Sequence, residues 1–381
     1  MSTNEEPLIS FLVPAYNCAD TIRDSLSTVL TTTDVPLQVV VVDDASTDDT
    51  ARILGEMAES DNRITVVYRS ENGGEGPARN SSLAAAKGQW IAFLDADDQI
   101  VDGAINKLGE LLPKTVSDVV ITRMFFDDVF NHERRRVDEA FMDDIAGIPT
   151  KPAELSSKLF TTVGSTLCNK VMRRSFIEEK DIRFLDVPRV ADISFTFSAC
   201  ALAERIEFAD IDQYNYVINH GASLTWTMDR YPLCFAEATY EVKRCLDKYG
   251  VWPIFQKDFL NWLSGNVVNN FNSMSSLEGY LALAQEFHDH GFEELGLDSL
   301  DRQDCTWPDR YDVCMSLWKE GVTKGLWVLF RILQNDSLNT IKFLKAENTS
   351  LKAELLARDE PQPTMQDKPS VLKRIRRRLS K

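Results

Sequence analysis

The sequence predicts an α/β fold, a doubly wound sheet, over about its first 110 residues. Strand-like apolar runs alternate with helical patterns at short intervals. The run "LQVVVV" at 37–42 is almost wholly β-branched, as expected of a parallel strand buried on both faces. Three of the strand-like runs end in polar clusters, which is where such sheets bind ligands.

The elements follow in order from residue 8. "LISFLVP" (8–14) predicts a strand that stops at Pro14, where the backbone loses a donor. "ADTIRDSLSTVL" repeats apolar residues on one helical face. "STDDTARILGEM" predicts a helix capped by Ser46 or Thr47. The remaining predicted elements are the strand "RITVVY", a short helix from Pro77 to Gly88, and the strand "WIAFL".

The polar clusters should meet in space, because parallel strands share one carboxyl edge. They are "PAYN" (14–17), "DDAST" (43–47) and "DADD" (95–98). Mg²⁺ and Mn²⁺ prefer oxygen ligands, commonly one or two carboxylates completed by phosphate oxygens. "DADD" therefore predicts a site for a metal-bound phosphate ligand. A second Asp-x-Asp, at 210–212, is interpreted as a loop without a ligand.

The pattern loosens after residue 110. "VSDVVITRMFF" predicts another strand, "NKVMRRSFIEEKDI" a helix, and "DISFTFSACALAERIEFA" a helix running into a strand. A Trp- and Phe-rich stretch with helical periodicity then predicts a helical module. The predicted boundaries are 1–225 for the α/β domain (a nucleotide-sugar half to about 110 and an acceptor half from about 111), 226–335 for the helical module, 336–360 for a coiled coil or helix, and 361–381 for a linker and basic tail.

Residues 336–360 carry apolar side chains at a and d spacing, with one polar exception. These positions are Ile341, Leu344, Asn348, Leu351 and Leu355. They predict a short coiled coil whose Asn348 fixes the register, or else a single surface helix. A coiled coil would make the protein a homo-oligomer of two or three chains.

The charge is unevenly distributed. The formal net charge is -17, and residues 362–381 carry seven basic residues against one acid, or +6, so the remainder carries -17 - 6 = -23. Such an acidic body argues against nucleic-acid binding. The closing "VLKRIRRRLSK" predicts a basic amphipathic helix on an anionic membrane surface, with a disordered end as the alternative.

Composition also indicates the compartment. The seven cysteines are odd in number and scattered without a C-x-x-C, so we expect reduced thiols. "MSTNEEPLIS" is too polar for a signal peptide, and no apolar stretch approaches the roughly 18 residues of a membrane span. We expect a cytoplasmic protein, peripheral on the inner face of the plasma membrane if the tail binds lipid.

An ordered set of motifs resembles the family 2 glycosyltransferases, inverting enzymes with the GT-A nucleotide-sugar fold. The matching stretches are "SFLVPAYNCADTIRDSLSTVL", "VVVVDDASTDDT", "ENGGEGPARNSSLAAAKGQWIAFLDADD" and, more loosely, "NKVMRRSFIEEKDIRFLDVPRVADISF". Together they cover about residues 8–220. The sequence is most similar in character to enzymes that build bacterial wall teichoic acids and capsules.

The resemblance implies a nucleotide pocket. Pro14, Ala15 and Tyr16 would border the base, with Tyr16 near its ring. Asp44 would accept a hydrogen bond from the uracil imide of a UDP-sugar. Arg79 would lie beneath the pocket and contact its acids or the donor, with a structural ion pair as the alternative.

The resemblance also assigns the residues around the diphosphate. Asn72 would shape a neighbouring loop whose glycines (Gly73, Gly74 and Gly76) let the backbone pass close to the ligand. Asp95 would contact the ribose or the donor sugar, and Asp97 would bind Mn²⁺ or Mg²⁺. His220 in "INHGASLT" is the candidate for a further ligand to the metal or the diphosphate.

Inversion needs a base that takes the proton of the acceptor hydroxyl. The family places this acid in a Glu-Asp pair; here Asp192 stands at the matching position, but Ala191 replaces the Glu. The alternative role of Asp192 is to cap the following helix.

These residues predict a metal-dependent inverting glycosyltransferase. It would transfer a sugar from a nucleotide-diphosphate sugar, which we expect to be a UDP-sugar. The acceptor would be a hydroxyl of a cell-surface polysaccharide or of a teichoic-acid-like polymer, with a lipid-linked polymer as one form. The loss of the Glu motivates an alternative, a catalytically silent nucleotide-sugar-binding or scaffold protein. A sugar nucleotidyltransferase is a second alternative, although "PAYNCAD" lacks the Gly-rich basic loop of that class.

Overall fold

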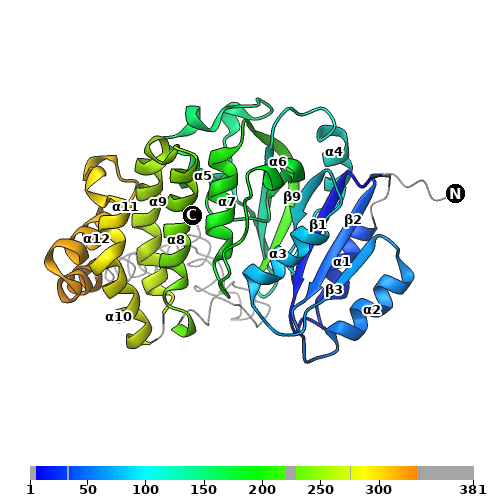
Figure 1. The fold of residues 1–381 in the computed structure, drawn as a ribbon, viewed down its shortest axis with the longest axis horizontal. Coiled ribbons are helices and arrows are strands. Elements are labelled where there is room, and N and C mark those ends of the chain that lie inside the picture. The colour runs from blue at the N-terminus through cyan, green and yellow to red at the C-terminus, as the bar shows by residue number, and fades with distance from the viewer. Residues whose placement is uncertain (1–5, 32–33, 219–228, 275, 333, 335–381) are drawn as a thin grey trace, which may run out of the picture.

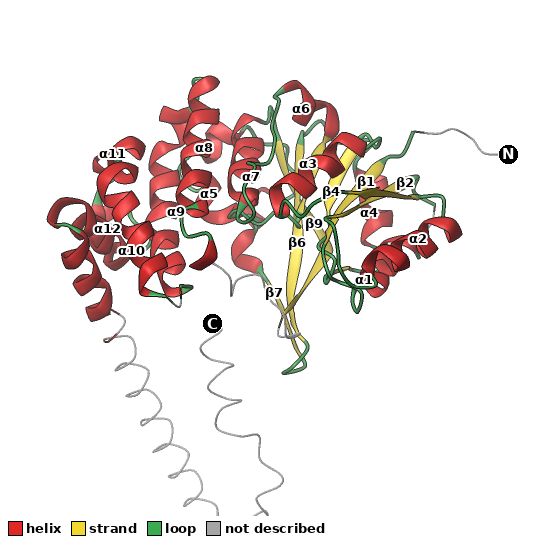
Figure 2. Cartoon of the chain, turned by 60° about the horizontal axis from the view of Figure 1, so that its bottom comes forward, coloured by secondary structure: helices red, strands yellow, loops and turns green. Residues whose placement is uncertain are grey.

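The computed structural model describes residues 6–31, 34–218, 229–274, 276–332 and 334 (Figure 1). An α/β part with a central sheet stands beside an all-helical part, and Figure 2 shows the same division in a second view. His220, the segment 336–360 and the basic tail lie outside the described residues. The predictions made for them therefore remain predictions.

The first half of the sheet follows the predicted alternation. Its strands are β1 (Ile9–Ala15), β2 (Leu37–Asp43), β3 (Ile64–Tyr68) and β4 (Trp90–Phe93), all mutually parallel in the order β3-β2-β1-β4. The connecting helices are α1 (Ile22–Leu30), α2 (Thr50–Ser60) and α3 (Glu75–Ala85). β1 continues through Pro14, which pairs in register with Val42, so the predicted strand end is one residue short.

Alternate residues of each central strand serve the two faces of the sheet. Phe11 and Val39 belong to one buried cluster, together with side chains of α1, α2 and α4 (Ala104–Leu111). Leu12 and Val40 belong to a second cluster, together with side chains of α3 and of the helical part. Because all four strand residues are fully buried, helices cover both faces, as the β-branched run predicts.

The second half of the sheet departs from a purely parallel arrangement. The sheet has nine strands in the order β3-β2-β1-β4-β8-β6-β9-β5, with β7 paired to β6, and β8 is antiparallel to both β4 and β6. Its later strands are β5 (Gln99–Ile100), β6 (Val119–Asp128), β7 (Glu133–Arg136), β8 (Lys170–Arg173) and β9 (Ile206–Ile218).

One helix predicted from sequence is wrong over half its length. The pattern of "NKVMRRSFIEEKDI" predicts a helix throughout, but residues 170–173 form β8 and only Arg174–Glu179 is helical, as α6. The short run "KVMR" becomes a strand because it fills the space between β4 and β6, where Val171 and Met172 are fully buried. Tertiary pairing decides the structure of such a short segment.

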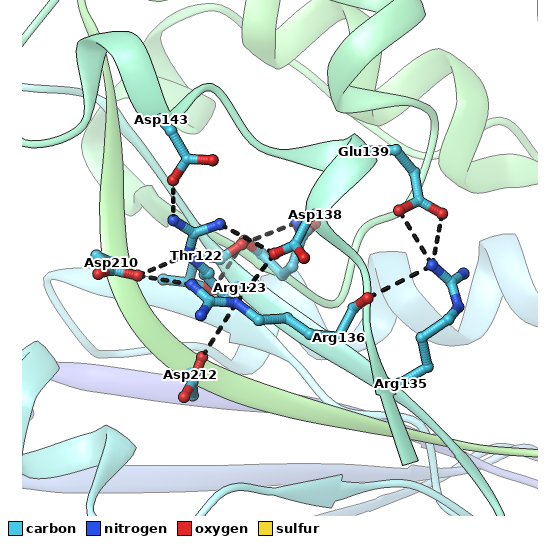
Figure 3. A network of polar contacts seen from close by, with 10 residues as sticks. Thr122, Arg123, Arg135, Arg136, Asp138, Glu139, Asp143, Asp210 and Asp212 are labelled. Carbon is cyan, nitrogen blue, oxygen red and sulfur yellow. Dashed lines mark hydrogen bonds and ion pairs between the residues drawn. The ribbon is translucent and has the colours of Figure 1, made fainter. Parts of the chain in front are cut away.

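The second Asp-x-Asp lies on β9 rather than in the predicted loop (Figure 3). Arg123 of β6 reaches Asp210 Oδ1 with its Nε at 2.6 Å, pairs also with Asp138 and Asp143, and stacks on Phe141 with its guanidinium 3.7 Å from the ring centre. This hydrogen bond from Arg123 holds the pKa of Asp210 below its ordinary value. These carboxylates neutralise Arg123, whose side chain is only 5% exposed. Arg123 lies where the pairing register of β6 with β9 shifts.

Helix α7 (Ala191–Leu202) joins the sheet to the helical part. The other helices are α5 (Leu159–Val163), α8 (Cys234–Lys248), α9 (Trp252–Asn272), α10 (Leu277–Glu286), α11 (Phe292–Leu295) and α12 (Pro308–Glu320). Phe197 of α7 lies 4.7 Å from Trp262 of α9, centre to centre, and 4.5 Å from Phe160 of α5. Asp258 of α9 accepts the Phe160 N–H at 2.6 Å, which caps α5 from another helix.

Two expectations from composition can be compared with the described residues. All seven cysteines fall within them and all are free thiols, as expected. Among the described helices, none combines the length and the apolar character that crossing a membrane requires.

Candidate active site

Two loops at the carboxyl edge of the sheet are joined by hydrogen bonds. The Asn17 N–H donates to Ser46 Oγ at 3.0 Å, and the Thr47 N–H donates to Asn17 Oδ1 at 2.8 Å. Ser46 and Thr47 therefore fasten the loop after β1 to the loop after β2. The prediction that one of them caps α2 is wrong, because Asp49 occupies that position.

The segment Pro14, Ala15, Tyr16 ends β1 at this edge. The buried Ala15 accepts the Asp44 N–H with its carbonyl at 2.8 Å, which aligns the ends of β1 and β2. Tyr16 directly follows the strand, and its side chain is 48% exposed. An aromatic face is thus available to a planar ligand beside the end of β2.

The Asp44 carboxylate is buried and holds the loop that precedes α3. It accepts the N–H of Gly73 at 3.1 Å and that of Gly74 at 2.8 Å, and it pairs with Arg69 Nε at 2.7 Å. Asn72, at the tip of this loop, is exposed. Asp44 therefore fixes the loop that bears Asn72 beside the end of β2.

The glycines of this loop are required by a neighbouring chain segment. A Cβ on Gly76 would lie 2.1 Å from the Leu185 carbonyl oxygen, and a Cβ on Gly74, whose φ is +83°, would lie 2.5 Å from Pro188 Cα. The Gly76 N–H also donates to the Val187 carbonyl at 3.3 Å. These glycines thus allow close approach to residues 185–188, which lead into α7, and the expected approach to a ligand stays a prediction.

Arg79 lies at the centre of the site with its side chain 5% exposed. Its Nη2 is 3.0 Å from Asp95 Oδ1, and its Nη1 pairs with Glu75 one helical turn earlier. Burial lowers the pKa of Arg79, but the charges of Glu75, Asp95 and Asp192 outweigh burial and raise it. Arg79 is therefore a fixed cation among three carboxylates, which lie on α3, in the loop after β4 and on α7.

The acids of "DADD" have different surroundings. Asp95 faces Arg79, and its backbone N–H donates to Tyr214 Oη at 3.1 Å. Tyr214 Oη in turn donates to Asp98 Oδ2 at 2.7 Å, and the Val217 N–H donates to Asp98 Oδ1 at 2.7 Å. Burial, and then the charge of Asp95, raises the pKa of Asp98 to about 8. Asp97 lies between them and is partly exposed.

Asp192 is the second residue of α7, after Val190 in a left-handed conformation with φ 51°. Burial and the charge of Glu75 raise the pKa of Asp192 to about 7, while Arg79 acts in the opposite direction. The structure thus brings Asp192 into electrostatic contact with Arg79 and Asp95, residues far away in the chain. A carboxyl group with such a pKa can both accept and release a proton near neutral pH.

Sequence reasoning missed three residues of this cluster. Glu75 precedes Arg79 by four residues, but the predicted helix begins only at Pro77, whereas α3 begins at Glu75. Asp98 stands out in the sequence only as a third acid, and its anchoring role depends on Tyr214, which lies 116 residues further along the chain. No local pattern connects Tyr214 with the "DADD" turn.

A divalent metal is implied by the family resemblance. Within the described part of the chain, no three His, Cys, Asp or Glu side chains are grouped so as to hold a metal ion. A cation held by one or two carboxylates and completed by donor phosphate oxygens does not need such a group. Asp97 is partly exposed and is the residue to which the family resemblance assigns this role.

The chain matches known proteins mainly in the α/β part. The family described as glycosyl transferase family 2 matches residues 10–180. The teichuronic acid biosynthesis glycosyltransferase TuaG of Bacillus subtilis is 44% identical over 97 residues, 26% of this chain and 38% of that protein. The succinoglycan biosynthesis protein ExoO of Rhizobium meliloti is 31% identical over 221 residues, 57% of this chain and 62% of that protein. The matches thus span less than two thirds of these relatives.

A solved structure extends the likeness to the helical part. The structure of S. aureus TarS in complex with UDP-GlcNAc matches with a TM-score of 0.64 and 22% identity, over 86% of this chain and 92% of that chain. Because identity is low, this match concerns the fold: a GT-A domain followed by a helical region.

Proposed function

We propose that this chain, which carries a family 2 glycosyltransferase domain of the GT-A fold, transfers a sugar with inversion from a UDP-sugar to a hydroxyl group of a cell-surface polysaccharide. The acceptor class is supported by the teichuronic acid and succinoglycan relatives. The donor class is supported by TarS, which was solved with UDP-GlcNAc. The nucleotidyltransferase alternative has no comparable support.

The observation that carries this proposal is the position of Asp192. Its carboxyl group, with a pKa of about 7, lies within electrostatic reach of Arg79 and Asp95 at the carboxyl edge of the sheet. We assign it the removal of the acceptor proton as the hydroxyl attacks the anomeric carbon. A carboxyl group with a pKa raised to about 7 holds a proton more strongly than an ordinary aspartate, as a general base requires.

The remaining residues bind and orient the donor. Tyr16 offers its ring to the base, and Asp44 keeps the loop bearing Asn72 beside the base site. Arg79 holds Asp95 toward the ribose or the donor sugar. Mn²⁺ or Mg²⁺ at Asp97 would supply positive charge to the leaving diphosphate.

The silent-protein alternative depends on Ala191. This residue is fully buried, and a Cβ added to Gly76 would lie 3.3 Å from Ala191 Cβ. Position 191 thus packs against the start of α3. Glu75 projects from the same helix start and acts on the pKa of Asp192, so a second carboxylate is present despite the substitution.

Calorimetric titration of UDP, GDP and CDP, with and without Mn²⁺, tests the donor site. We expect UDP binding that requires Mn²⁺ and is lost in Asp97→Ala. Asp102→Ala is the matched control, because this exposed aspartate lies five residues further on and should leave binding unchanged. Absence of nucleotide binding under every condition would overturn the proposal, whereas UDP binding without sugar transfer would favour the silent alternative.

A further inference from the structure

Glu75, the first residue of α3, is held both by its backbone and by its side chain. Its N–H donates to the Pro188 carbonyl at 3.3 Å, and its carboxylate pairs with Arg79 one helical turn later. Pro188 lies four residues before Asp192. The backbone of Glu75 is therefore bound to the segment that leads into α7, while its carboxylate lies in the charged cluster that contains Asp192.

The residue at position 191 supplies no charge to this cluster. Ala191 is fully buried, and a Cβ added to Gly76 would lie 3.3 Å from Ala191 Cβ, closer than an ordinary van der Waals contact. The start of α3 thus packs against position 191, and a longer side chain there would meet it. Glu75 directly precedes Gly76, so the facing element carries the carboxylate that position 191 lacks.

Arg79 divides its guanidinium between two acids other than Asp192. Its Nη1 pairs with Glu75, its Nη2 lies 3.0 Å from Asp95 Oδ1, and its Nε has no hydrogen-bond partner among the described residues. Loss of Glu75 would release Nη1, and Asp192 is a further carboxylate whose charge acts on this arginine. An aspartate in a buried ion pair with arginine loses proton affinity, so such a pair would weaken Asp192 as a base.

Charged groups from three parts of the fold act on the Asp192 carboxyl group. Glu75 of α3 and Asp95 of the loop after β4 raise its pKa, whereas Arg79 of α3 lowers it. Lys170 of β8, which is fully buried, also attracts the charge of Asp192. Among these charges Glu75 has the largest effect on the pKa of Asp192. Removal of Glu75 lowers this pKa twice over, because one negative charge is lost and the charge of Arg79 is no longer offset.

We propose that Glu75 is a positioning residue of this site, which supplies from α3 the second carboxylate that Ala191 does not supply. By engaging Arg79 it keeps Asp192 out of a buried ion pair and available to take a proton. This role rests on the proposed function, in which Asp192 is the base. The pair of acids then consists of Glu75 and Asp192, which stand on two facing helices rather than side by side in the chain.

The proton affinity of Asp192 can be measured without any sugar transfer. In the full chain labelled with carbon-13 at its aspartate carboxyl groups, the resonance that is absent from Asp192→Asn reports Asp192. Its titration midpoint, expected at about 7 in the wild type, should fall by about one pH unit in Glu75→Gln. Glu59→Gln is the matched control, because this exposed glutamate of α2 lies outside the site and should leave the midpoint unchanged. An unchanged midpoint in Glu75→Gln would overturn the proposal.

Turnover tests whether this effect serves catalysis. Glu75→Gln should lower kcat about ten-fold at saturating UDP-sugar, because a weaker base accepts the proton less readily. The pH of half-maximal rate should fall together with the titration midpoint, while calorimetric binding of UDP stays that of the wild type. A merely structural role would lower Tm and leave the pH profile in place. A shifted midpoint in a protein whose wild type transfers no sugar would count against the proposed function alone.

An exchange of the two side chains tests the substitution itself. Glu75→Ala should lower turnover, and the addition of Ala191→Glu should restore most of it, because the shortened residue 75 leaves room for a longer residue 191. Ala191→Glu alone should lower Tm, since its side chain meets the start of α3. Equal turnover of Glu75→Ala with and without Ala191→Glu, in proteins that still bind UDP, would overturn the exchange. If the double variant does not fold, the titration of Asp192 in Glu75→Gln decides the proposal.

Discussion

At the residue scale, three aspartates within four positions receive three different environments. Asp95 is neutralised by Arg79, Asp98 is buried beside Tyr214 with a raised pKa of about 8, and Asp97 remains partly exposed. Like charges at this spacing would repel one another if all were ionised and unpaired. The ion pair of Asp95 with Arg79 and the raised pKa of Asp98 reduce the repulsion within the carboxylate cluster that follows the buried strand β4.

If Asp192 is the base in the proposed sugar transfer, its raised pKa predicts how the transfer rate depends on pH. A general base acts in its deprotonated form, so the transfer rate should rise with pH through about 7 and level off above it. Asp192→Asn should lower turnover by about 10²–10⁴-fold, since this is the usual contribution of general-base catalysis. The measurement is UDP release from UDP-GlcNAc and UDP-glucose between pH 5 and 9, with calorimetry to check that the variant still binds UDP.

Asp186→Asn is the control for this experiment, because the residue is an exposed acid on the segment just before α7. It should keep both the rate and the pH profile of the wild type. An Asp192→Asn variant with wild-type turnover would exclude Asp192 as the base.

At the scale of elements, the start of α3 and the segment before α7 are fitted to each other. Gly76 leaves no room for a Cβ beside the Leu185 carbonyl. Asn80 donates to the Phe184 carbonyl at 2.9 Å and accepts the Phe184 N–H at 3.0 Å. This contact fixes where α7 begins, and therefore where Asp192 lies relative to Arg79.

Gly76→Ala should disturb this contact. Its Cβ would meet backbone at 2.1 Å, so either residues 185–188 move or the free energy of unfolding falls by about 1–3 kcal/mol, the usual cost of overpacking. Gly55→Ala, within α2, is the control: its Cβ would meet only Tyr68 Oη at 3.6 Å, and it should stabilise the protein by about 0.5–1 kcal/mol. Urea unfolding of both variants measures the two effects, and equal effects of the same sign would contradict the account.

At the scale of the whole molecule, the α/β part and the helical part share one core. A single buried cluster runs from Phe93 of β4 through Phe195 and Phe197 of α7 to Trp262 of α9. Aromatic rings of α7 and α9 are in contact, so the apolar core continues without a break from one part to the other. We therefore expect the helical part to be required for the stability of the α/β part.

Scanning calorimetry should show one cooperative transition for both parts. Trp262→Ala removes a side chain of a residue that is only 5% exposed, so it should lower the free energy of unfolding of the whole chain by about 3–5 kcal/mol. Leu277→Ala is the control, since that side chain is 70% exposed and its removal should leave Tm nearly unchanged. Two separate transitions, of which Trp262→Ala shifts only one, would contradict a shared core.

Much of the fold and several site positions follow from the sequence alone. Apolar runs and helical patterns are local, and they predict β1 to β4 with their helices to within a few residues. Parallel strands must end at one edge, and this rule by itself places Tyr16, Asp44 and Asp95 together.

Other features depend on tertiary contacts between segments far apart in the chain. Residues 170–173 form a strand because β4 and β6 flank them. Gly76 is required by Leu185, and Asp98 is anchored by Tyr214. Asp192 acquires its raised pKa from burial and from charges on α3. Local patterns report propensity and amphipathicity, whereas pairing, close approach and desolvation exist only once distant segments have met in the folded chain.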